Sequence, residues 1–98
     1  MECIWVSKTA SAVVTVTNKL GLHARPATLF AETASRNQSD IMVRRCDQDS
    51  PVDGKSIMQM MMLAATQGTQ IEIAAEGSDA EAAVEALVSL VESGFQED

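Results

Sequence analysis

The sequence predicts an α+β fold in which three helices cover one face of a four-stranded, mainly antiparallel sheet. Four short segments are rich in β-branched residues or alternate between apolar and polar ones, as strands do. Three longer segments have apolar residues at helical spacing, and the order of elements is β-α-β-β-α-β-α. A chain of 98 residues is long enough for one two-layer core and too short for two.

The first half of the chain predicts a strand, a helix and a second strand. Residues 12–17 (AVVTVT) are mostly β-branched and predict the first strand. Residues 24–37 predict a helix that ends before a cluster of polar residues, and residues 41–44 alternate as the second strand. The helix has apolar side chains at core spacing, namely Ala27, Phe30, Ala31 and Ala34.

The middle of the chain predicts a turn, a short strand and a second helix. Residues 47–54 form the turn, with a short third strand around residues 51–53. The helix begins at Ser56, where Ser-Ile-Met-Gln matches a capping box, and it ends near Thr66. Gly68 is the expected left-handed residue that ends this helix.

The last part of the chain predicts a strand and a third helix. Residues 70–74 alternate as the fourth strand, and residues 78–81 (SDAE) form a capping box that begins a helix ending near Gly94. We expect residues 1–10 to be an extension ahead of a folded domain at residues 11–98. The apolar stripe of the last helix consists of Ala80, Val84, Leu87 and Val91.

Charge and cysteine content limit the functions to consider. Residues 1–49 have six basic and five acidic side chains (+1), and residues 50–98 have one and nine (−8), which gives the net charge of −7. This acidity repels a phosphate backbone, so nucleic acid is not an expected partner, and the acidic half reads as a solvated helix face and tail. No run is long enough to insert into a membrane, and the first ten residues lack the apolar core of a signal peptide. Cys3 and Cys46 do not make a disulfide framework, which favours reduced thiols in a cytoplasmic protein.

The segment LGLHARPA at residues 20–27 contains the only histidine, His23. Gly21 permits a tight bend, and Pro26 is tolerated only in the first turn of a helix, so His23 lies at or just before a helix N-terminus. The positive end of the helix leaves the imidazole neutral and nucleophilic at pH 7, and together with Arg25 it favours a bound anion. The structural alternative is that the ring only caps the helix or packs against the core. We interpret His23 as a carrier of a phosphoryl group.

Ser56 allows both a structural and a regulatory interpretation. As the first residue of a capping box it is a structural N-cap, and a helix N-terminus also tolerates an added phosphate. Gly-Lys-Ser at residues 54–56 ends a nucleotide-binding P-loop motif, but Asp49 occupies the position of the first glycine of that motif, so ATP binding is excluded. One histidine and two distant cysteines form no ligand cluster, so neither a metal nor a cofactor is expected.

The second helix is apolar nearly all round, since Gln59 is the only polar residue in positions 57–65. A helix lying on one face of a sheet cannot bury both sides, so one apolar side is expected to face partners through flexible methionines. The alternative is that most of these residues belong to the core. On a helical wheel one side has Met60, Leu63 and Ala64, and the other has Ile57, Met58, Met61 and Ala65.

Two segments resemble the HPr family, the histidine phosphocarriers of the bacterial phosphoenolpyruvate-dependent phosphotransferase system. Residues 14–27 (VTVTNKLGLHARPA) are similar to the active-site segment of that family, and residues 54–58 (GKSIM) to its regulatory serine segment. The resemblance runs from about residue 12 to the C-terminus and implies an open-faced β-sandwich. Residues 93–98 (SGFQED) look more like the nitrogen-related branch than the sugar-transport branch.

The resemblance implies a carrier that is not itself an enzyme. By this resemblance, Enzyme I would pass phosphate from phosphoenolpyruvate to Nδ1 of His23. Arg25 and the backbone N–H groups of Ala24 and Arg25 would hold the phosphate, and an EIIA-type protein would receive it. Ser56 is similar to the serine that HPr kinase/phosphorylase modifies. The alternative function is a regulatory module that binds kinases, transporters or transcription factors according to its phosphorylation state. A monomer is expected, with a partner surface formed by Ile57, Met58, Met61 and Met62 and with Met60 and Leu63 in the core.

Overall fold

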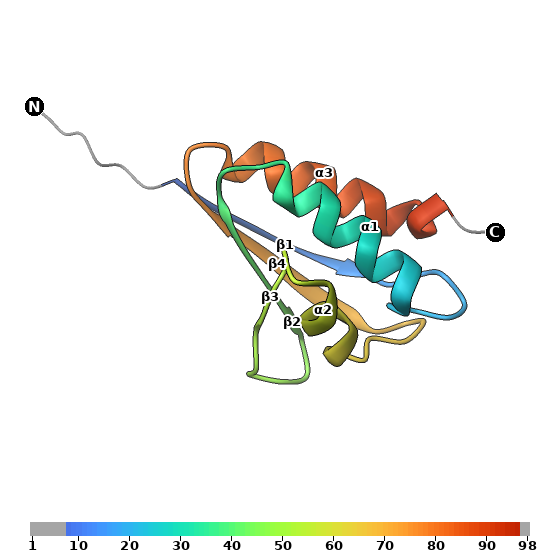
Figure 1. Cartoon of the computed structure of the whole chain (residues 1–98). Helices are drawn as coiled ribbons and strands as arrows, with labels where there is room; N and C mark the ends of the chain where they lie inside the picture. The colour runs from blue at the N-terminus through green and yellow to red at the C-terminus, as the bar shows by residue number, and fades with distance from the viewer. Residues whose placement is uncertain (1–7, 97–98) are drawn as a thin grey trace, which may run out of the picture.

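The computed structural model describes residues 8–96, in which three helices cover one face of a four-stranded antiparallel sheet (Figure 1). The sheet order is β1-β4-β2-β3, and each neighbouring pair is antiparallel. The predicted fold class and order of elements are therefore confirmed. The elements are β1 (Thr9–Thr15), α1 (Ala24–Ser35), β2 (Asp40–Arg45), β3 (Val52–Asp53), α2 (Ile57–Met62), β4 (Gln70–Glu76), α3 (Ala80–Glu92) and a terminal 3-10 turn (Gly94–Gln96).

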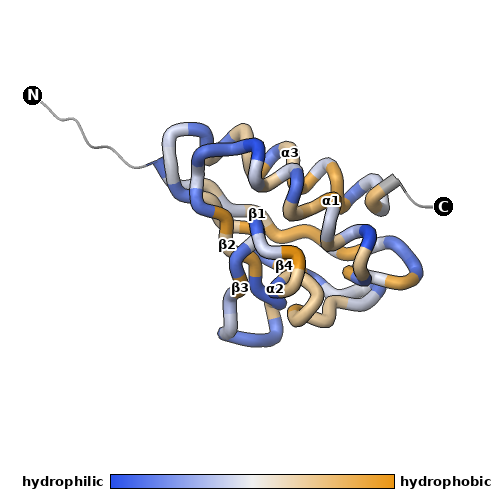
Figure 2. Tube along the Cα trace, in the orientation of Figure 1, coloured by the Kyte–Doolittle hydropathy of each residue, from blue (hydrophilic) through white to orange (hydrophobic). Residues whose placement is uncertain are grey.

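The alternation seen in the sequence separates the two faces of the sheet. Val14 pairs with Ile71 and Val43 with Ile73, and all four side chains are buried beneath the helices. Residues between them face solvent on the open side of the sheet, as Met42 does. Figure 2 shows hydrophobic colour on the central strands and hydrophilic colour on the loop that joins β2 to β3.

The helices cover the sheet with the residues that their spacing indicated. The buried residues of α1 are Pro26, Ala27, Phe30, Ala31 and Ala34, and those of α3 are Ala80, Ala83, Val84, Leu87 and Val91. Phe95 adds a second fully buried aromatic ring from the terminal turn. Within residues 8–96 no helix is long and apolar enough to cross a membrane.

The predicted end of the second helix is wrong. α2 stops at Met62 and not near Thr66, because Ala64 adopts a left-handed conformation with φ of 56°. Gly68 also has a positive φ of 91°, but it lies in the turn before β4, where its N–H donates to the carbonyl of Val16 at 2.8 Å. A non-glycine residue therefore supplies the left-handed turn after α2, and the tertiary contacts described below hold it there.

The predicted capping box of the last helix is also wrong. The N-cap of α3 is Asp79 and not Ser78, and the Asp79 side chain makes no capping hydrogen bond. Its carboxylate instead accepts hydrogen bonds from the backbone N–H groups of Gln38 and Ser39, at 2.8 and 2.9 Å. The carboxylate thus joins two loops rather than satisfying its own helix.

The first strand begins earlier than predicted, at Thr9 and not at residue 12. Thr9, Ala10 and Ser11 continue the antiparallel register with β4, although their own side chains carry little strand signal. Residues 1–7, which include Cys3 and Trp5, lie outside the described residues. The division into an extension at 1–10 and a domain at 11–98 stays a prediction.

Candidate functional site

The loop that leads from β1 to α1 is held against the loop after α2 by a close backbone contact. Gly21 has φ of 66°, and a Cβ atom at this position would lie 2.3 Å from the carbonyl oxygen of Ala65. The N–H of Leu22 donates to the same carbonyl at 2.9 Å. Only glycine combines this backbone conformation with this approach, so the sequence Gly-Leu-His fixes where the chain enters α1.

Short-range hydrogen bonds close the loop in front of His23. The Asn18 side-chain amide donates to the carbonyl of Gly21 at 2.8 Å in a buried position, and the Gly21 N–H donates to the carbonyl of Asn18 at 3.2 Å. The N–H of His23 also donates to the Gly21 carbonyl, at 3.0 Å. Leu22 is buried directly before the histidine. These contacts fix the backbone that presents the imidazole.

His23 is the N-cap residue of α1, as its position before Pro26 indicated. Its backbone is extended (φ −82°, ψ −167°), and its carbonyl accepts the first helical hydrogen bond, from Ala27 at 3.0 Å. The imidazole makes no hydrogen bond that caps the helix, and the residue is half-buried. The interpretation of His23 as a helix-capping side chain is therefore wrong, and the ring does not belong to the fully buried core.

Backbone donors and a cation accompany the imidazole at this end of α1. Ala24 and Arg25 are the first two residues of the helix, and N–H groups in a first turn have no partner within the helix. Ala24 and Arg25 are exposed to solvent, whereas Pro26, which has no N–H, is fully buried. The structure thus brings His23, Ala24 and Arg25 together at the positive end of a helix, a setting that favours an anion.

Ser56 is the N-cap of α2, and its hydroxyl accepts a hydrogen bond from the N–H of Gln59 at 3.2 Å. In the predicted capping box the Gln59 side chain would also accept a hydrogen bond from the Ser56 N–H, and this second hydrogen bond is not formed. The Gln59 side chain accepts instead from the backbone N–H of Asp53, at 2.9 Å. Ser56 is half-buried, so the cap is structural and its hydroxyl remains near the surface.

The exposed side of α2, which we call the α2 surface, consists of Ile57, Met58, Met61 and Met62. Their exposed fractions are 40, 75, 44 and 74%, whereas Met60 and Leu63 are 0 and 4% exposed. The interpretation that most residues of this helix belong to the core is therefore wrong. The helical wheel fails only beyond the end of the helix, where Ala65 is buried and Ala64 is exposed.

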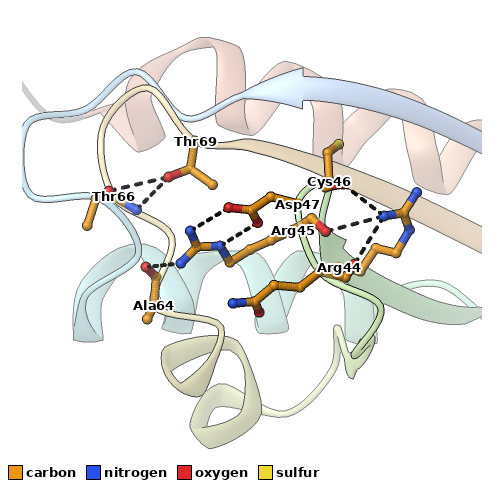
Figure 3. A network of polar contacts seen from close by, with 8 residues as sticks. Arg44, Arg45, Cys46, Asp47, Ala64, Thr66 and Thr69 are labelled. Carbon is orange, nitrogen blue, oxygen red and sulfur yellow. Dashed lines mark hydrogen bonds and ion pairs between the residues drawn. The ribbon is translucent and has the colours of Figure 1, made fainter.

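Arg45 supports the end of α2 and was not identified from the sequence. Its guanidinium donates two hydrogen bonds to the Asp47 carboxylate, at 3.1 and 3.0 Å, and a third to the carbonyl of Ala64 at 3.2 Å (Figure 3). The side-chain hydrogen bond lowers the pKa of Asp47 and raises the pKa of Arg45. The Arg-x-Asp spacing was the only available signal, and it does not reveal the third contact, 19 residues away.

Two further observations concern this site, namely its possible metal ligands and the similarity of the chain to known proteins. Within residues 8–96 no group of three or more His, Cys, Asp and Glu side chains could hold a metal ion. The sequence model of the PTS-HPr family, described as the PTS HPr component phosphorylation site, matches residues 10–93.

The chain belongs to the HPr family.

Known HPr proteins agree in sequence over most of their length. The phosphocarrier protein HPr of Neisseria meningitidis is 46% identical over 84 residues, which cover 86% of this chain and 92% of that protein. The phosphocarrier protein NPr of Escherichia coli is 37% identical over 90 residues, or 92% of this chain and 99% of that protein. The resemblance inferred from two short segments is thus confirmed.

A solved HPr structure agrees in fold. The crystal structure of HPr-C-His from Thermoanaerobacter tengcongensis matches with a TM-score of 0.84 and 45% identity, and covers 91% of this chain and 98% of that chain. The open-faced β-sandwich implied by the resemblance is therefore the fold of this member of the HPr family.

Proposed function

We propose that this HPr-family protein carries a phosphoryl group on Nδ1 of His23, as a monomer, from Enzyme I to an EIIA-type acceptor. The observation that carries the proposal is the placement of the half-buried His23 at the N-cap of α1, next to the exposed residues Ala24 and Arg25. The carrier function is assigned to the predicted domain at residues 11–98, whose first strand also includes Thr9 and Ala10 from the predicted extension at residues 1–10. In this proposal the protein carries the phosphoryl group between two other proteins and is not an independent catalyst.

The chemistry follows from the atoms around the ring. The lone pair of Nδ1 attacks phosphorus, and a P–N bond forms as the bond from phosphorus to the donor atom of Enzyme I breaks. The new dianion then lies near the N–H groups of Ala24 and Arg25 and within reach of the Arg25 guanidinium. A helix N-terminus contributes about 0.3–1 kcal/mol to such a charge, and a charge-assisted hydrogen bond about 1.5–3 kcal/mol. This moderate stabilisation suits a group that must be passed on.

Docking of Enzyme I and of the acceptor is assigned to the α2 surface. Its four apolar side chains are exposed, and α2 packs against α1, whose N-terminus carries His23. Ser56 begins the same helix, so a phosphate added there by an HPr kinase/phosphorylase would place negative charge beside Ile57. We infer that such a phosphate obstructs docking while leaving the helix cap intact.

The test is phosphotransfer from phosphoenolpyruvate labelled with ³²P, in the presence of Enzyme I. We expect acid-labile label on the wild-type protein, as a phosphorus–nitrogen bond requires, and no label on His23→Ala. Acid-stable label that survives His23→Ala would contradict the proposal. Stable binding to a kinase, transporter or transcription factor without any phosphotransfer would favour the regulatory module instead.

A further inference from the structure

The α2 surface contains three of the six methionines of this chain, Met58, Met61 and Met62. Met58 and Met62 are about three-quarters exposed, and Met61 is somewhat less than half exposed. Met60, in the same helix, is fully buried. One short helix therefore presents a cluster of exposed methionine residues together with a buried one.

We propose that Met58, Met61 and Met62 form a reversible oxidation site for peroxides, and that their oxidation switches off docking at the α2 surface. This inference rests on the proposed function, because it takes the α2 surface as the docking site. In each step the thioether sulfur attacks the outer oxygen of the peroxide. An S–O bond forms and the O–O bond breaks, so that sulfur loses two electrons and hydrogen peroxide is reduced to water.

The fold of α2 does not depend on the three exposed methionines. Met60 anchors the helix in the core, and the Ser56 cap and the Gln59 contact with Asp53 hold its first turn. Arg45 holds the carbonyl of Ala64 just after its last turn. Oxidation of the exposed sulfurs therefore changes the chemistry of the surface and leaves the helix in place.

A sulfoxide changes docking because it turns a flexible apolar side chain into a polar one. A partner groove that takes up a methionine buries its thioether, whereas a buried sulfoxide oxygen loses its hydrogen bonds to water. We expect the affinity of Enzyme I to fall about tenfold for each methionine that it buries. Methionine sulfoxide reductases transfer two electrons from a dithiol to the sulfoxide and release its oxygen as water, so the switch is reversible.

The experiment treats the protein with graded hydrogen peroxide and locates the sulfoxides by peptide mass spectrometry. Cys3→Ser and Cys46→Ser are introduced throughout, so that thiol oxidation does not contribute. We expect sulfoxide first at Met58 and Met62, later at Met61, and none at Met60 while circular dichroism remains unchanged. Met42 is exposed on the opposite face of the sheet, and it serves as an oxidisable methionine outside the α2 surface.

The second measurement is phosphotransfer from Enzyme I before and after peroxide. We expect at least a tenfold rise in the Enzyme I concentration needed by the oxidised protein, and recovery after treatment with MsrA and MsrB in the presence of dithiothreitol. Met42→Leu should respond to peroxide like the parent protein. The triple variant Met58→Leu, Met61→Leu and Met62→Leu, compared with itself before treatment, should show no response.

The outcomes separate this inference from the function on which it rests. Unchanged transfer by protein with sulfoxide at Met58 and Met62 would overturn the switch while leaving the carrier function standing. A peroxide response that persists in the triple leucine variant would overturn it as well. Failure of the untreated protein to accept phosphate would contradict the carrier function, and the docking part of the inference with it.

Discussion

The carboxylate of Asp79 accepts a hydrogen bond from the hydroxyl of Ser39, which lies 40 residues earlier in the chain. It also accepts hydrogen bonds from the backbone N–H groups of Ser39 and Gln38, and these bonds join the start of α3 to the turn between α1 and β2. Gly77 permits this contact, since a Cβ atom there would lie 2.6 Å from the Ser39 hydroxyl oxygen. These bonds lower the pKa of Asp79, chiefly through the Ser39 hydroxyl.

The lowered pKa of Asp79 predicts how Asp79→Asn responds to pH. A carboxylate whose pKa is depressed in the folded state stabilises the protein at pH values above its unfolded-state pKa of about 3.9. This contribution is lost as the pH falls through the folded-state pKa. We expect Asp79→Asn to be less stable than wild type near pH 7, with a difference that shrinks below about pH 4. Urea unfolding at several pH values measures it. The exposed carboxylate of Glu85, in the middle of the same helix, provides Glu85→Gln as a control. An Asp79→Asn difference that does not change with pH would contradict the argument.

The close approach at Gly21 predicts that Gly21→Ala displaces the loop that carries His23. The added Cβ would lie 2.3 Å from the Ala65 carbonyl in addition to adopting a left-handed backbone, so we expect destabilisation of about 2–3 kcal/mol and slower phosphotransfer. Gly68→Ala is the matched control, because Gly68 also has a positive φ but a Cβ there meets nothing within 4 Å. It should cost about 1 kcal/mol and leave transfer unchanged. Equal effects of the two substitutions would show that the clash is unimportant.

Local sequence signals predicted the positions that depend on the nearest residues. Gly21 and Pro26 place the start of α1 and hence His23, and Ser56 marks the start of α2 by its own cap. Alternation and helical spacing gave the core faces, because burial follows the backbone period.

Long-range contacts decided what the sequence did not predict. The end of α2 depends on Arg45 reaching the Ala64 carbonyl, and the start of α3 on Asp79 turning toward Ser39. In both places a side chain that could bond to its own neighbours in the chain forms a hydrogen bond with a distant residue. The separation is 19 residues for Arg45 and 40 residues for Asp79. Such pairings follow from the packed fold, and short-range patterns contain no information about them.

The position of Arg25 at the start of α1 predicts that its removal slows phosphotransfer, whereas removal of an arginine at the end of α1 should not. Arg25→Ala removes a cation from the proposed phosphate site, and we expect phosphotransfer to fall about tenfold, the equivalent of one charge-assisted hydrogen bond. Arg36→Ala is the matched control, since Arg36 is also exposed but is the C-cap of α1. Single-turnover transfer from phosphorylated Enzyme I measures both. A similar loss in the two variants would mean that net charge, and not the position of Arg25, is what matters.

The position of Ser56 allows the effect of charge to be separated from the effect of the cap. Asp and Asn are both good N-caps, so Ser56→Asp and Ser56→Asn should each keep the hydrogen bond from the Gln59 N–H and remain within about 0.5 kcal/mol of wild type in stability. Only Ser56→Asp adds negative charge beside the exposed Ile57. We expect it to raise the KM for Enzyme I several-fold at low salt, with the effect reduced by added salt because exposed charges are screened. Steady-state phosphotransfer at two ionic strengths provides the measurement. If Ser56→Asn impaired transfer as much as Ser56→Asp, the obstruction would be steric, and the electrostatic account of regulation at this serine would be wrong.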